Sequence, residues 1–79
     1  MRIVTFYTKP GCHLCDTAKD ILRRVRRDEP FELVEVNIRT DAALYEKYRE
    51  RIPVVSLDGK DIFDYEVNEA QLRKALKGG

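Results

Sequence analysis

The chain has 79 residues and carries 15 Lys and Arg against 14 Asp and Glu, a formal net charge of +1. A charge this close to zero gives no reason to expect a nucleic acid or an anionic membrane as a partner. No apolar run approaches the ~20 residues that span a bilayer and no charged-then-apolar leader precedes the first strand, so we expect one cytoplasmic domain over residues 1–79.

The first predicted elements are a strand and a helix joined by a turn. A β-branched and aromatic run covers Ile3 to Tyr7 and stops at Thr8-Lys9-Pro10-Gly11, where proline and glycine mark the turn. A helical pattern begins near His13, and Pro30 forbids its continuation. Its apolar stripe consists of Leu14, Ala18, Ile21, Leu22 and Val25.

A second strand and a short helix are predicted next. Phe31 to Ile38 alternates between apolar and polar residues about a helix-length after the first strand, which predicts a parallel βαβ unit. Its apolar members are Phe31, Leu33, Val34, Val36 and Ile38. Thr40 or Asp41 can cap the short helix, which must end before Pro53.

The last third of the chain predicts a hairpin and a final helix. Val54–Leu57 and Asp61–Phe63 flank Asp58-Gly59, a strong two-residue hairpin signal. Asn68 is expected to cap the last helix, which Gly78 and Gly79 end. Its apolar stripe is Ala70, Leu72, Ala75 and Leu76. The order therefore predicts an α/β fold with four strands in one mixed sheet and helices on both faces.

Two cysteines stand in Cys12-His13-Leu14-Cys15, where the first strand gives way to the first helix. With Cys12 just ahead of the helix and Cys15 one turn inside it, the unpaired N–H groups and positive dipole end favour a thiolate at Cys12. Thiolates attack disulfides, and two cysteines this close enclose too small a loop to stabilise a fold. The spacing therefore indicates reversible redox chemistry.

The segment from Lys9 to Cys15, with Ile52-Pro53-Val54 and the Asp58-Gly59 hairpin, resembles glutaredoxins of the thioredoxin superfamily. The likeness is closest to short glutaredoxin-like proteins that carry Cys-His-Leu-Cys-Asp. It implies a thioredoxin fold and a thiol–disulfide oxidoreductase that exchanges a dithiol with protein disulfides or glutathione-mixed disulfides. It assigns nucleophilic attack to Cys12 and resolution of the mixed disulfide to Cys15.

The resemblance also implies substrate-binding residues outside the cysteine motif. Pro53 corresponds to a cis proline that places the backbone of Ile52 beside the reactive sulfur, where an extended substrate can pair with it. Lys9 can stabilise the Cys12 thiolate or bind a substrate carboxylate. The alternative for Lys9 is a solvated lysine in a turn.

Four further side chains are candidates with open alternatives. His13 can donate a hydrogen bond to the Cys12 sulfur and tune its redox potential, or it can be an exposed ring without effect. Tyr7, together with Phe63 and Tyr65, can line a groove for the substrate, or these aromatic residues can belong to the core or its rim.

Glutathione-dependent glutaredoxins carry a Gly-Gly pair after the hairpin, where this chain has Ile62–Val67 with Phe63 and Asp64. The bulk of these side chains predicts weaker glutathione binding. We expect no bound cofactor and a monomer, with glutathione, another low-molecular-weight thiol or a reductase as electron donor. The alternative function is an iron–sulfur cluster carrier in which two monomers present Cys12 and glutathione completes the ligands.

Overall fold

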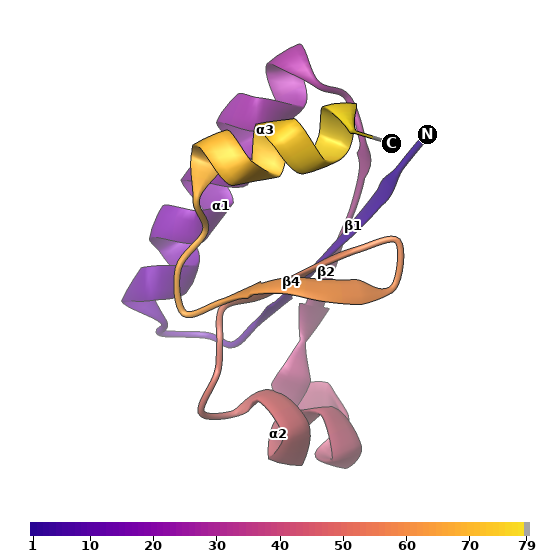
Figure 1. Ribbon diagram of the computed structural model, residues 1–79. Helices are drawn as coiled ribbons and strands as arrows, with labels where there is room; N and C mark the ends of the chain where they lie inside the picture. The colour runs from indigo at the N-terminus through magenta and orange to yellow at the C-terminus, as the bar shows by residue number, and fades with distance from the viewer. Residues whose placement is uncertain (79) are drawn as a thin grey trace.

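Four strands form one mixed sheet in the computed structural model of the chain, which describes residues 1–78 (Figure 1). The elements are β1 (Ile3–Thr8), α1 (His13–Asp28), β2 (Glu32–Asn37), a 3₁₀ turn η1 (Ile38–Thr40), α2 (Ala42–Tyr48), β3 (Val54–Leu57), β4 (Lys60–Asp64) and α3 (Glu69–Lys77). The strand order is β2-β1-β3-β4, with β1 parallel to β2 and antiparallel to β3. Helices α1 and α3 lie together on one side of the sheet and α2 on the other (Figure 1), which confirms the predicted arrangement.

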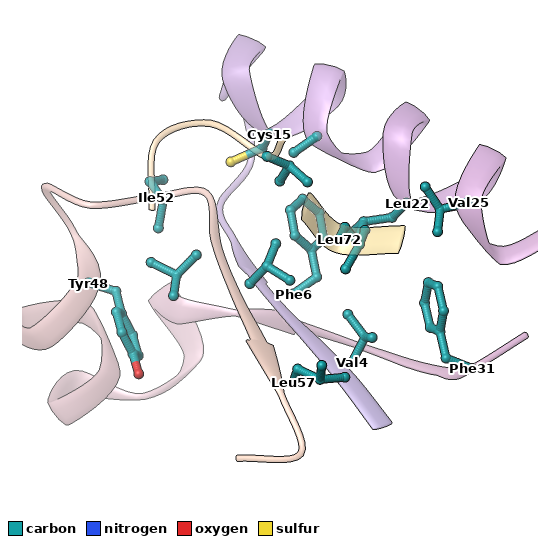
Figure 2. Close-up of a cluster of buried hydrophobic side chains, with 14 of the residues drawn as sticks. Val4, Phe6, Cys15, Leu22, Val25, Phe31, Tyr48, Ile52, Leu57 and Leu72 are labelled. Atoms are coloured by element: carbon teal, nitrogen blue, oxygen red, sulfur yellow. The ribbon is translucent and has the colours of Figure 1, made fainter. Parts of the chain in front are cut away.

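The main core lies between the sheet and the pair α1 and α3. Side chains alternate along β1, so Val4 and Phe6 point toward these helices and are buried. Leu22 of α1 and Leu72 of α3 are fully buried opposite them (Figure 2). This packing holds α1 and α3 against the sheet.

Leu14 departs from the predicted apolar stripe of α1. The rest of the stripe is buried or partly buried, but the Leu14 side chain is 51% exposed. It belongs to the first turn of α1, at the end of the sheet, where only the segment around Tyr65 and Val67 lies opposite and leaves a small hollow. The helical period predicted the apolar face of α1 correctly, but it did not predict that the first turn of this face is left exposed.

The second strand is shorter than predicted, because it runs from Glu32 to Asn37. Phe31 precedes it and Ile38 begins η1, yet both side chains are buried. Val34, one of the apolar members of the predicted strand, lies within the edge strand β2 and is 40% exposed. Ala70 of α3 is likewise exposed, against the prediction, because its side of α3 faces solvent.

Side-chain caps define the two later helices. Asp41 caps α2 by accepting hydrogen bonds from two backbone N–H groups, and Thr40 is the last residue of η1. Asn68 caps α3 as predicted, and Gly78 follows its last turn. Gly79, predicted as part of that helix end, lies outside the described residues. None of the helices within residues 1–78 has the length and apolar character needed to cross a membrane.

The hairpin between β3 and β4 turns at Asp58 and Gly59, as predicted. Both residues have positive φ, 51° and 89°, which suits a two-residue turn between twisted strands. The Asp58 carboxylate accepts hydrogen bonds from the Arg2 side chain and the Ile3 backbone. The hairpin is thereby joined to the start of β1.

A polar network joins the α2 side of the sheet to the segment that precedes β3. Tyr48 of α2 stacks on Tyr7 with ring centroids 4.5 Å apart, and its hydroxyl donates to the Asp61 carboxylate at 3.1 Å. Asp61 also accepts a hydrogen bond from the buried Ser56, which holds the pKa of the Asp61 carboxyl below its usual range. Arg51 lies over the Tyr48 ring. These contacts position the chain just before the Ile52–Pro53 peptide.

Candidate redox site

The two cysteines occupy different environments at the start of α1. Cys12 is the N-cap residue in an extended conformation, with φ −95° and ψ 109°, and its sulfur accepts a hydrogen bond from the Cys15 backbone N–H at 3.2 Å. Cys12 is partly exposed, whereas Cys15 is only 3% exposed; both are free thiols. The predicted placement, one cysteine ahead of the helix and one inside its first turn, is confirmed.

Burial raises the pKa of the Cys15 thiol to about 11, and its hydrogen bond with Cys12 acts in the same direction. Hydrogen bonding by the Thr8 side chain and the Lys9 backbone opposes this effect on the pKa. Cys15 is therefore a protonated thiol at neutral pH. Only Cys12 offers an accessible sulfur beside backbone N–H groups that favour negative charge.

The Ile52–Pro53 peptide bond is cis, as the resemblance implies. Both residues are buried, and Figure 2 shows the Cys15 sulfur pointing toward the segment that carries Ile52. The Tyr65 backbone N–H donates to the carbonyls of Arg51 and Pro53, at 3.0 Å each, and ties this segment to the chain after β4. Pairing of a substrate with the Ile52 backbone stays a prediction.

The remaining candidates, Lys9, His13 and Tyr7, have different surroundings. Lys9 lines two hollows on either side of the loop that leads to Cys12. His13 is exposed, and within residues 1–78 its ring makes no hydrogen bond to the Cys12 sulfur. Tyr7 is directed to the α2 side, where it stacks on Tyr48.

The two aromatic residues near the end of the hairpin, Phe63 and Tyr65, differ in burial. Phe63 packs against the core, whereas Tyr65 is 50% exposed and holds a positive φ of 67°. Tyr65 therefore presents its ring on the surface beside the cis-proline segment. The structure describes no group of three or more His, Cys, Asp or Glu side chains within residues 1–78 that is placed to hold a metal ion.

Sequence reasoning missed a cleft of about 390 Å³ behind Cys15. Its lining includes Thr8 from the end of β1 and Glu35 from β2, in addition to Lys19 from α1. The alternation along β1 was the available signal, because it places Thr8 on the same face as Phe6. The sequence pattern alone groups Thr8 with the turn at Pro10 and Gly11.

Comparisons with known proteins agree with this geometry. The profile of the Glutaredoxin-like domain (DUF836) matches residues 3–77. The Glutaredoxin-like protein YDR286C homolog of Dictyostelium discoideum is 31% identical over 75 residues, which cover 87% of this chain and 69% of that protein. Protein XcR50 from X. campestris is 32% identical, with a TM-score of 0.78 over 96% of this chain and 97% of its own.

A more distant structure bears on the fold alone. Mitochondrial thioredoxin 3 from Saccharomyces cerevisiae has a TM-score of 0.73 at 18% identity and is matched by 99% of this chain over 78% of its own. The four-stranded sheet with its three helices is therefore a thioredoxin fold, as the resemblance implies.

Proposed function

The chain belongs to the glutaredoxin-like domain family, and from this membership we propose that it is a thiol–disulfide oxidoreductase. It exchanges its Cys12 and Cys15 dithiol with the disulfides of proteins or with glutathione-mixed disulfides. The observation that carries the proposal is the asymmetry of the two thiols. Cys12 caps α1 and is partly exposed, whereas Cys15 is buried one turn further on.

Cys12 performs the first step. Its thiolate attacks one sulfur of the substrate disulfide, a bond forms between Cys12 and that sulfur, and the other substrate sulfur leaves as a thiolate. The Cys15 N–H at 3.2 Å and the N-terminal end of α1 stabilise negative charge on the attacking sulfur.

Cys15 performs the second step. It loses its proton and attacks the Cys12 sulfur, so that the Cys12–Cys15 disulfide forms and the substrate leaves as a thiolate. Two electrons have then passed to the substrate. An external donor, either a thiol such as glutathione or a reductase, returns them without a bound cofactor.

Single-cysteine variants test the proposal. We expect Cys12→Ser to abolish exchange with a peptide disulfide, since the attacking sulfur is lost. Cys15→Ser should instead accumulate a mixed disulfide that intact-mass measurement detects. The double variant serves as the background control. Equal residual exchange in both single variants would contradict the assignment.

A further inference from the structure

The cleft behind Cys15 lies between α1 and the face of the sheet formed by β1 and β2. It is open to solvent, and seven of its lining residues are polar or charged or bear the thiol: Thr8, Lys9, Cys15, Asp16, Lys19, Glu35 and Asn37. Because Cys15 is one of these lining residues, the cleft offers a route from its buried thiol to water.

Resolution requires this route. Cys15 must become a thiolate before it can attack Cys12, yet its pKa of about 11 leaves it protonated at neutral pH. Burial is the main cause, because a charged sulfur is poorly solvated there. A donor that reaches the Cys15 sulfur while its charge develops therefore accelerates the second step and leaves the first unaffected.

Thr8 lies on the side of the sheet from which a hydrogen-bond donor can reach Cys15. It is the last residue of β1 and shares the face on which Phe6 points toward α1, so its hydroxyl lies on the α1 side of the sheet. Thr8 and Cys15 line the same cleft. Hydrogen bonding from the Thr8 side chain already lowers the pKa of Cys15 against the effect of burial.

We propose that Thr8 is a positioning residue for resolution: its hydroxyl donates a hydrogen bond to the Cys15 sulfur as that sulfur passes its proton to water in the cleft. The bond between Cys12 and the substrate sulfur then breaks, the Cys12–Cys15 bond forms, and the electron pair leaves with the substrate thiolate. This inference rests on the proposed function and adds the group that assists its second step.

The charged groups around the cleft lie on the loop after β1, on α1 and on β2, whereas β1 itself contributes none. Lys9 lies in the loop after β1, Asp16 and Lys19 lie on α1, and Glu35 lies on β2. The Lys19 Nζ and a Glu35 carboxylate oxygen are 3.2 Å apart, so these two charges are paired. Thr8 has no charge. Its replacement therefore changes hydrogen bonding to Cys15 without changing the charged groups around the cleft.

The test separates the two steps kinetically. Resolution is followed as release of a fluorescent peptide thiol from the mixed disulfide on Cys12, in the unchanged protein and in Thr8→Val and Thr8→Ser. We expect Thr8→Val to resolve roughly three- to tenfold more slowly, because it loses a hydrogen bond to a charged sulfur while the more basic thiolate that remains is a better nucleophile. Thr8→Ser, which keeps the hydroxyl, should restore the rate.

Attack is measured in the Cys15→Ser background, where Thr8→Val should leave the rate unchanged. In the Cys12→Ser background, ultraviolet thiolate absorbance reports the Cys15 pKa directly, and Thr8→Val should raise it. An unchanged resolution rate, an equal slowing of both steps, or an unchanged Cys15 pKa would overturn the role of Thr8. Absence of any mixed disulfide in Cys15→Ser would refute the proposed function instead, while the pKa measurement still decides the role of Thr8.

Discussion

The Cys15 backbone N–H donates to the Cys12 sulfur at 3.2 Å, so the residue that we propose resolves the mixed disulfide also stabilises negative charge on the sulfur that we propose attacks first. The same turn of α1 exposes one thiol and buries the other. A single turn of helix thereby gives Cys12 and Cys15 the different surroundings on which the proposed division of the two steps rests.

This asymmetry predicts selective alkylation. At neutral pH, iodoacetamide should modify Cys12 and leave Cys15 largely unmodified, since Cys15 is buried and its pKa is about 11. Peptide mass mapping over a time course measures both rates. The Cys15 rate should keep rising above its ordinary pKa of 9.0. Equal labelling of both thiols in the folded protein would contradict the arrangement.

The ion pairs between α1 and α3 predict a loss of stability in acid. Glu69 contacts Arg24 at 2.6 Å and Arg73 at 3.0 Å, and these guanidinium groups lower its pKa from 4.5 to about 2. Because the folded-state pKa is the lower one, the stabilisation is present above pH 4.5 and is lost as the pH falls toward 2.

Urea unfolding at neutral pH and within that acid interval measures the effect. Glu69→Gln should unfold more easily at neutral pH and show a weaker dependence on acid than the unchanged protein, with a modest difference because the pair is exposed. Glu50→Gln is the matched control, since Glu50 is exposed and makes no ion pair within residues 1–78. An identical acid dependence in Glu69→Gln would exclude the role of this pair.

The core between α1 and the sheet predicts that truncation of Leu22 destabilises the protein strongly and that truncation of Leu14 destabilises it little. Leu22 is fully buried, so Leu22→Ala should lower the free energy of unfolding by about 2–5 kcal/mol through lost burial and a cavity. Leu14 lies on the same helix and is 51% exposed, so Leu14→Ala should change the free energy of unfolding by about 0.5 kcal/mol or less. Denaturant unfolding of the two variants gives the comparison, and similar losses would contradict the placement of the core.

The position of Tyr65 leads to a prediction about how much glutathione adduct the protein forms. Its ring is exposed beside the cis-proline segment, and we expect the protein equilibrated in glutathione redox buffers to form little glutathione adduct. Tyr65→Gly should increase the adduct, since it removes bulk and glycine suits a φ of 67° without strain. Alkylation trapping followed by intact mass counts the adducts, with Tyr65→Phe as control.

The same titration yields the reduction potential of the Cys12 and Cys15 pair. A value near −270 mV without adduct would support a donor other than glutathione, whereas roughly −200 to −230 mV with a stable adduct would support glutathione and contradict the expectation for Tyr65.

Local signals in the sequence were sufficient for most elements and for the position of the thiols. Pro30 lies just beyond the end of α1, Asp58 and Gly59 form the hairpin turn, and Asn68 caps α3, because each acts on the backbone within a few residues. The placement of Cys12 at a helix N-cap depends on the same short-range chemistry.

Tertiary packing alone decided which apolar positions are covered and which groups meet across the sheet. Val34 is exposed on the edge strand β2, and the Tyr48 hydroxyl of α2 reaches the Asp61 carboxylate of β4. Thr8 and Cys15 line one cleft because the end of β1 and the first turn of α1 border it. Such relationships depend on strand order and on how α1 packs against the sheet, which bring together segments that local sequence signals do not relate.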